Sequence, residues 1–201
     1  MKCCRVFYLI LLLLFTACAT CAILFPQYRR TSESNSNSTD TVYFWYRQST
    51  ASIAGVPSIV IGRTYSYNLL CQQGQVYYTV TAALSVAAAA FLGASTLFTA
   101  CWINSRTEDG LIVTSVFMTF MGLACAAVTV ALTAYTYVTT VCQGELTEMK
   151  AAKDNGFNLV EGFYLICIAA GGSLICFIFG FGLCCASVCC GGDDKNDDDY
   201  E

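Results

Sequence analysis

Residues 159–188, LVEGFYLICIAAGGSLICFIFGFGLCCASV, form one long apolar stretch. The stretch contains no Lys, Arg or His, and its only acid is Glu161, close to its start. A helix of about 20 residues crosses a hydrocarbon core about 30 Å thick. The stretch therefore has the length and composition of a transmembrane helix, with residues to spare for tilting or for extending past the lipid.

Three more stretches have the same character, and no charged residue interrupts any of them. They cover residues 6–25, 77–102 and 111–138. Hydrophobic residues make up 56% of the chain and charged residues only 12%, whereas soluble domains carry about 25% charged residues. We therefore predict an all-α membrane protein built as a bundle of four transmembrane helices.

The four stretches divide the chain into membrane spans, loops and tails. The first stretch could instead be a cleaved signal peptide, because Ala17-Cys18-Ala19 resembles a cleavage site. However, the apolar core of a signal peptide runs about 7–15 residues, so we expect an uncleaved helix. The predicted layout is a cytoplasmic N-terminus at 1–5, spans at 6–25, 77–102, 111–138 and 159–188, extracellular loops at 26–76 and 139–158, a cytoplasmic loop at 103–110 and an acidic cytoplasmic tail at 189–201.

The basic residues do not decide which side of the membrane holds the loops. Fewer of them lie on the side of the chain ends than on the side of the two longer loops. Because cytoplasmic loops usually carry more Lys and Arg, this count alone favours loops in the cytoplasm. The two groups are Lys2, Arg5, Arg106 and Lys195 against Arg29, Arg30, Arg47, Arg63, Lys150 and Lys153.

Two other features favour extracellular loops. Asn37-Ser38-Thr39 is a glycosylation acceptor, which requires an outside location, although such triplets also arise by chance. Cysteines crowd the ends of the chain beside the membrane, where cytosolic palmitoylation occurs, although cysteine also serves as a small apolar residue in lipid. We expect cytoplasmic termini and a plasma-membrane location. The candidate acylation sites are Cys3, Cys4, Cys184, Cys185, Cys189 and Cys190.

Two cysteines, Cys71 and Cys142, fall in the predicted outer loops. Cys71 precedes the second span by a few residues, and Cys142 follows the third by a few, so both are expected just above the membrane on the same face. An oxidising compartment would allow them to pair. We predict a Cys71–Cys142 disulfide, which requires Cα atoms within about 7 Å.

The chain lacks the side chains that most enzyme and transport chemistry needs. It has no His, so it has no His-based triad or metal cluster. No charged residue lies in the middle of a span, and we find no polar stripe that would face the bundle axis, which disfavours a transporter. The net charge of −4 disfavours nucleic-acid binding. We predict no enzymatic activity, cofactor or small-molecule substrate. The expected partners are the lipid bilayer, the chain itself and other surface membrane proteins.

The first loop contains an aromatic cluster, Tyr43-Phe44-Trp45-Tyr46, directly after a polar run. Residues 41–46 and 58–67 are rich in residues that favour strands, and their separation indicates an antiparallel pair. We therefore predict a small extracellular β-sheet in the first loop, resting on the helix ends. The cluster would attach this sheet to the bundle, and direct contact with a partner is the alternative.

Residues 41–51, TVYFWYRQSTA, resemble the loop signature of the amastins, four-helix surface glycoproteins of kinetoplastid parasites. Thr41 and Ala51 stand where the family has two cysteines. The absence of both cysteines from this chain is expected if the two bond to each other in the family. Tyr43 and Tyr46 also depart from the signature, and Gly162-Phe163 resembles the start of the fourth helix in the family. The positions that fit the signature are Phe44, Trp45, Gln48 and Thr50.

The resemblance implies a glycosylated surface protein with a structural or adhesive role at the cell surface or the parasite–host boundary. The claudin and peripheral-myelin superfamily is a more distant resemblance, but its Trp-Gly-Leu-Trp motif and paired loop cysteines are missing. It implies a tetraspan scaffold or membrane organiser. A lipid-organising scaffold that uses the acylated cysteines and a channel subunit are further alternatives.

Overall fold

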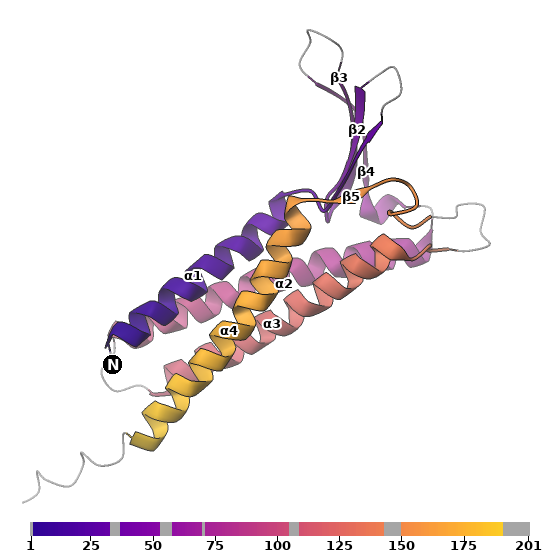
Figure 1. Cartoon of the computed structure of the whole chain (residues 1–201). Coiled ribbons are helices and arrows are strands. Elements are labelled where there is room, and N and C mark those ends of the chain that lie inside the picture. The colour runs from indigo at the N-terminus through magenta and orange to yellow at the C-terminus, as the bar shows by residue number, and fades with distance from the viewer. Residues whose placement is uncertain are drawn as a thin grey trace, which may run out of the picture.

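The computed structural model describes residues 2–32, 37–52, 58–69, 71–104, 109–142 and 150–190 (Figure 1). Its four α-helices are all long and apolar enough to cross a membrane, as the sequence predicted. Such a set indicates a multi-pass membrane protein. The helices are α1 (Lys2–Leu24), α2 (Gln72–Asn104), α3 (Asp109–Val138) and α4 (Glu161–Cys190).

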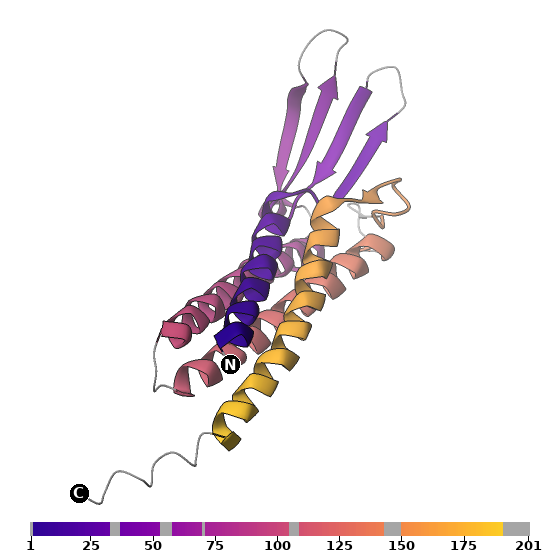
Figure 2. The same cartoon turned by 60° about the vertical axis from the view of Figure 1, so that its left-hand side comes forward.

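The helices form a ring in which α1 packs against α2 and α4, and α3 packs against the same two helices from the other side (Figures 1 and 2). Small residues allow close approach between them. A Cβ atom on Gly122 of α3 would lie 2.9 Å from Cγ of Leu92 on α2. A Cβ atom on Gly172 of α4 would overlap the ring of Phe15 on α1. Van der Waals contact of this kind is what holds helices together in lipid.

A cluster of hydroxyl groups lies in the centre of the bundle and corrects one expectation from the sequence. We expected no polar stripe on the bundle axis, yet Ser95, Thr99, Ser115, Thr119 and Tyr8 are all fully buried there. The Oγ atom of Ser95 lies 2.8 Å from Oγ of Ser115 and 2.7 Å from Oγ1 of Thr119. The hydroxyls therefore satisfy one another between α1, α2 and α3. Charged side chains are costly inside a membrane, whereas hydroxyls of this kind cost little when they pair.

The outward faces of the helices are apolar. Phe7 and Leu14 on α1, Leu97 on α2, Phe117 on α3 and Phe181 on α4 each have more than half of their surface exposed. Exposed apolar surface on this scale is costly in water. The outward surface of the bundle is therefore suited to contact with lipid.

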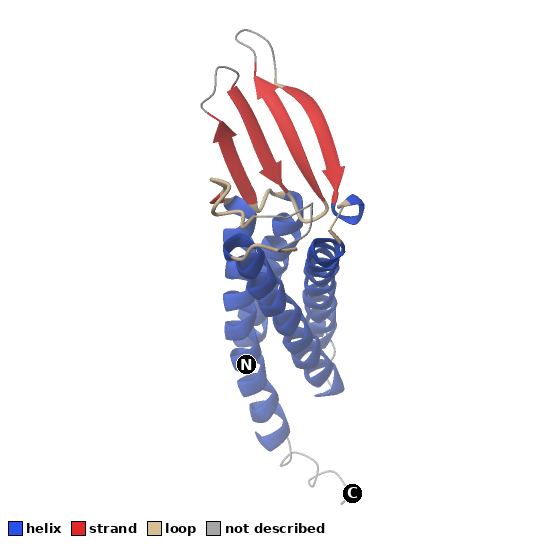
Figure 3. Ribbon diagram, turned by 90° about the vertical axis from the view of Figure 1, so that its right-hand side faces the viewer, coloured by secondary structure: helices blue, strands red, loops and turns tan. Residues whose placement is uncertain are grey.

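An antiparallel sheet of five strands extends from one end of the bundle, which we call the sheet end (Figure 3). The opposite end, where α1 begins and α4 ends, is the terminal end (Figure 1). The strand order is β4-β3-β2-β1-β5. The strands are β1 (Tyr28–Ser32), β2 (Asn37–Val42), β3 (Tyr46–Ser52), β4 (Ile59–Tyr65) and β5 (Asn158–Leu159).

The predicted pair of strands was only partly right. Residues 59–65 form β4 as expected, but 41–46 do not form one strand, since the chain turns at Tyr43 and begins β3 at Tyr46. The amide of Tyr43 donates to the carbonyl of Tyr46 at 2.8 Å, which closes this turn. The sheet is also not confined to the first loop, because β5 comes from the second loop and pairs with β1.

Candidate functional site at the junction of the sheet and the bundle

The sheet is attached to the bundle through Pro26 and Gln27, which follow α1. The amide of Gln27 donates to the carbonyl of Val42 at 2.7 Å, and the carbonyl of Gln27 accepts from the amide of Val160 at 3.1 Å. The amide of Gly162 donates to the carbonyl of Pro26 at 3.0 Å. A Cβ atom on Gly162 would overlap the Gln27 side chain, so the first turn of α4 requires glycine here. These contacts fix the sheet against the ends of α1 and α4.

The Cys71–Cys142 disulfide ties the start of α2 to the chain that leaves α3. Both cysteines are buried, and their Cα atoms lie 6.3 Å apart. They pack with Val141 and Tyr77 in a small apolar cluster. This is the pair that the sequence predicted. Cys142 has a φ of 62°, a left-handed conformation that favours glycine.

The aromatic cluster divides into an anchor and an exposed residue. Phe44 is 3% exposed, whereas its neighbour Trp45 is 41% exposed. The rings of Tyr43 and Tyr46 stack at 4.6 Å between centroids, on either side of the turn. Ser66 closes the junction by donating its amide hydrogen to the carbonyl of Trp45 at 3.0 Å. The cluster therefore packs the base of the sheet, while the Trp45 ring remains accessible.

An ion network crosses the middle of the sheet. Asp40 on β2 accepts from Arg30 at 2.6 Å and from Arg47 at 3.0 Å, and Ser49 donates to its other carboxylate oxygen. The two guanidinium groups also lie 5.1 Å and 5.3 Å from the centre of the Phe157 ring. Burial alone would raise the pKa of Asp40, but the hydrogen bonds from Ser49, Arg47 and Arg30 outweigh it and lower the pKa. Asp40 is therefore ionised at neutral pH, and two cations share its single negative charge.

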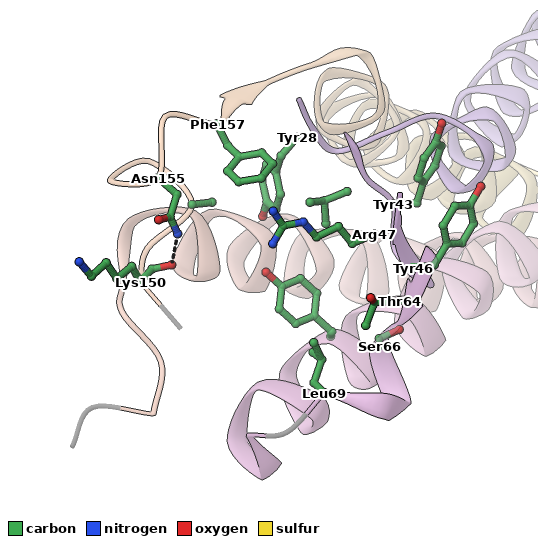
Figure 4. Close-up of a pocket in the computed structure, with 13 residues that line it drawn as sticks. Tyr28, Tyr43, Tyr46, Arg47, Thr64, Ser66, Leu69, Lys150, Asn155 and Phe157 are labelled. Atoms are coloured by element: carbon green, nitrogen blue, oxygen red, sulfur yellow. Dashed lines mark hydrogen bonds between the residues drawn. The ribbon is translucent and has the colours of Figure 1, made fainter. Parts of the chain in front are cut away.

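A cavity of about 170 Å³ lies beside this network, between the sheet, α2 and the segment that precedes β5 (Figure 4). We call it the junction cavity. Its walls are mainly apolar and include several aromatic rings, and the guanidinium of Arg47 extends among them toward Tyr28 and Phe157 (Figure 4). Lys150 also lines the cavity, but its ammonium group points away from Arg47. The aromatic lining residues are Tyr28, Tyr43, Tyr46, Tyr78 and Phe157.

The free edge of the sheet is the second notable surface. β4 is the outermost strand, and all seven of its residues are exposed. Ile59, Val60 and Ile61 are 53%, 48% and 68% exposed. An edge strand carries unpaired backbone donors and acceptors, and natural edges are usually short, charged or covered. The opposite edge, β5, has only two residues.

The four positions that fit the amastin signature do not form one site. Phe44 and Trp45 lie in the turn, and Gln48 and Thr50 lie on β3. Gln48 accepts a hydrogen bond from Arg63 at 3.0 Å, and Thr50 donates to a backbone carbonyl of β2 at 3.1 Å. Phe44, Gln48 and Thr50 therefore support the turn or the sheet, whereas the Trp45 side chain is exposed.

The two positions that hold cysteine in the signature are also separated. Thr41 pairs with Gln48, and Ala51 pairs with Ser38. Three residue pairs along a strand correspond to about 10 Å, which is beyond the reach of a disulfide. The idea that cysteines at these two positions would bond to each other is therefore wrong for this register.

The candidate acylation sites lie at the terminal end. Cys3, Cys4 and Cys185 are exposed and Cys184 is partly buried. Cys101, at the end of α2, is exposed as well and was not among the candidates. The side chains of Cys189 and Cys190 lie outside the described residues, as does the side chain of Asn37, whose backbone belongs to β2. Acylation and glycosylation both stay predictions.

No protein-family model matches the chain, and no curated protein matches it either. The resemblance to the amastins therefore stays a prediction.

The junction cavity and the β4 edge were not predicted from the sequence. The arginines of the first loop were the available signal for the cavity. Arginine commonly pairs with carboxylates or binds anions, so their number in this loop could have indicated such a site.

Proposed function

We propose that this chain is an amastin-like surface membrane protein whose sheet lies outside the cell and attaches facing membranes through contacts between copies of the chain. The observation that carries the proposal is the β4 edge, where apolar side chains and unpaired backbone groups are exposed together. Extending a sheet with a strand from another chain is a common mode of protein recognition. The occupant we propose is β4 of a second copy.

The direction of β4 favours contact between membranes. The strands extend away from the sheet end of the bundle, at an angle to α2 and α3 (Figure 1), and β4 runs from its outer end at Ile59 back to the bundle at Tyr65 (Figure 2). A copy in the same membrane would present its β4 in the same direction and would pair in parallel. A copy in a facing membrane is inverted, so its β4 would pair antiparallel, which is the slightly more stable arrangement.

The composition of β4 suits such self-pairing. Gly62 is the central residue of the strand, so an antiparallel pair in full register would place the two Gly62 residues opposite each other. No atom lies within 4 Å of a Cβ built on Gly62, so its face is open. Ile59, Val60 and Ile61 are all exposed in the outer part of the strand, where the pairing with β3 shifts by one residue and leaves Ile61 without a partner residue. Pairing would therefore cover exposed apolar side chains of both chains.

Clustering of vesicles tests the proposal. The full chain is reconstituted into phosphatidylcholine vesicles that carry one of two lipid dyes, and energy transfer between the dyes reports clustering. We expect clustering when both populations contain the chain. The Ile61→Lys variant should lose it, because lysine on an edge strand opposes pairing. The control is Asn158→Lys, which adds the same charge to the exposed β5 edge and should leave clustering unchanged.

Two results would overturn the proposal. Clustering of loaded vesicles with empty ones would show that the partner is lipid and not a second copy. Equal clustering by the unmodified chain and by Ile61→Lys would show that the β4 edge is not the contact.

A further inference from the structure

We infer that the junction cavity binds the oxyanion of a small amphiphile, a phosphate group carried on a short apolar or aromatic body. The inference rests on one cation that projects into an aromatic cavity and retains unused donors. It does not depend on the proposed pairing of β4, because Arg47 lies on β3, on the side of β4 that is already paired.

The charge at the cavity favours an anion. Arg30 and Arg47 share the single carboxylate of Asp40, so this group of three side chains has a net charge of +1. One nitrogen of Arg47, Nη2, contacts Asp40. In the part of the chain that the structure describes, the other nitrogens of this guanidinium have no hydrogen-bond partner. A guanidinium presents five donors in a planar fork that matches phosphate, so Arg47 can bind Asp40 and an anion at the same time.

The walls of the cavity favour an apolar body beside the anion. The hydroxyl of Tyr28 donates to the backbone carbonyl of Thr133 at 2.6 Å, so the Tyr28 hydroxyl is occupied within the bundle. Leu69 and Val42 extend the apolar surface. A free inorganic anion would leave these walls in contact with water. An anion attached to an aliphatic or aromatic group would cover them.

The size of the cavity limits the ligand. Its volume is about 170 Å³, whereas sites for drug-sized molecules have about 300–1,000 Å³. An engineered cavity of about 150 Å³ holds benzene. The junction cavity therefore fits a head group or a short organic phosphate, and it is too small for a complete lipid or a folded peptide.

The position of the cavity brings lipid head groups close to it. Tyr78, which lines the cavity, lies in the second turn of α2. Tyrosine is enriched where a span meets the head groups. A phosphate from the surrounding leaflet and a soluble organic phosphate offer the same chemistry, and the experiment separates these two sources.

Binding to the full chain in phosphatidylcholine nanodiscs tests the inference. The probe is dioctanoyl phosphatidic acid, with retention measured by native mass spectrometry, and glycerol 3-phosphate is the soluble competitor. We expect saturable binding that weakens about tenfold or more in Arg47→Gln, the effect of losing a charge-assisted hydrogen bond. The control is Arg63→Gln. Arg63 is a β4 arginine that binds Gln48 and does not line the cavity, so this variant should bind within about twofold of the unmodified chain.

A second variant covers the case in which Arg47→Gln disturbs the sheet. Thr64 lines the cavity on β4, and Thr64→Trp should fill the space while leaving the Asp40 network unchanged. Its control is Ile59→Trp, which lies on the same face of β4 as Thr64 by the pairing with β3 and lies outside the cavity. We expect Thr64→Trp to lose binding and Ile59→Trp to retain it.

The competition experiment distinguishes a soluble phosphate from a lipid head group. Competition by glycerol 3-phosphate would identify a soluble phosphate as a sufficient ligand, and a lack of competition would identify a lipid head group. Both results support an oxyanion site. Equal retention of phosphatidic acid by the unmodified chain and by Thr64→Trp would overturn it, as would unchanged binding to folded Arg47→Gln.

Discussion

Asp40 of β2 and Arg30 of β1 face each other directly across the two strands, with 2.6 Å between carboxylate and guanidinium. This pair helps to explain why more basic residues lie at the sheet end than at the terminal end. Arg47 shares the same carboxylate, and Arg29 lies 3.6 Å from Glu161. Three of the basic residues that opposed an extracellular loop are thus partnered within the folded sheet or at its base. Their presence is explained by the stability of the sheet, which weakens their value as a signal of orientation.

The lowered pKa of Asp40 predicts a pH dependence for the sheet. A carboxyl whose folded pKa lies below its unfolded value of about 3.9 stabilises the fold above that value, and its contribution is lost as the pH falls through the folded pKa. We expect Asp40→Asn to melt at a lower temperature than the unmodified chain at pH 7. The difference should shrink below about pH 4. Thermal melts followed by circular dichroism at pH 7, 5 and 3 measure it, and a constant difference would contradict the prediction.

Removing the disulfide should destabilise the sheet end. Cys71 and Cys142 are 71 residues apart in sequence, and a cross-link of this length stabilises a soluble protein by about 4 kcal/mol in the chain-entropy model. Helices that persist in the unfolded state reduce this value, so we expect about 2 kcal/mol for Cys142→Ser, measured by denaturant titration in detergent. Cys142→Gly should lose less, because glycine adopts the left-handed conformation at lower cost.

Two adjacent glycines on α4 provide a matched test of helix packing. A Cβ on Gly172 would overlap the Phe15 ring, whereas a Cβ on Gly171 would meet nothing within 4 Å. We expect Gly172→Ala to destabilise the bundle by about 1–3 kcal/mol through overpacking. Gly171→Ala should be neutral or slightly stabilising. Similar melting temperatures for the two variants would show that α1 and α4 do not pack as described.

The buried hydroxyl cluster should contribute modestly to stability. Ser95 contacts both Ser115 and Thr119, and hydrogen bonds between transmembrane helices contribute about 0.6 kcal/mol on average and at most about 1.7. We expect Ser95→Ala to cost about 1 kcal/mol in a reversible unfolding assay in bicelles. Thr114→Ala is the control, because Thr114 is partly exposed and bonds only within its own helix. A larger loss in Thr114→Ala would contradict the role of the cluster.

Alanine substitutions of the neighbours Phe44 and Trp45 should have different effects on folding and on surface level. Phe44 is buried at the base of the sheet, so Phe44→Ala should cost about 3–5 kcal/mol and reduce the amount of folded protein at the cell surface. Trp45 is exposed, so Trp45→Ala should leave folding and surface level unchanged. Surface biotinylation together with thermal melts separates these effects. Equal surface loss in both variants would show that Trp45 also serves as an anchor.

The helices could be predicted from the sequence because lipid imposes a minimum apolar length on every span. The sheet was harder to predict because β2, with the sequence NSTDTV, has no alternation of apolar and polar residues. Such strands are defined by their partners and by the turn at Tyr43 more than by their own composition. The junction cavity depends on the register that sets Arg47 opposite Val42, and one sequence alone does not specify that register.

The Cys71–Cys142 bond has a consequence for biogenesis. Cys71 immediately precedes α2, Cys142 follows α3 by a few residues, and the two helices form a hairpin that returns to the sheet end (Figure 1). The two thiols meet only after this hairpin has closed. With the sheet end outside the cell, as proposed above, the redox state of the pair reports whether the hairpin has closed.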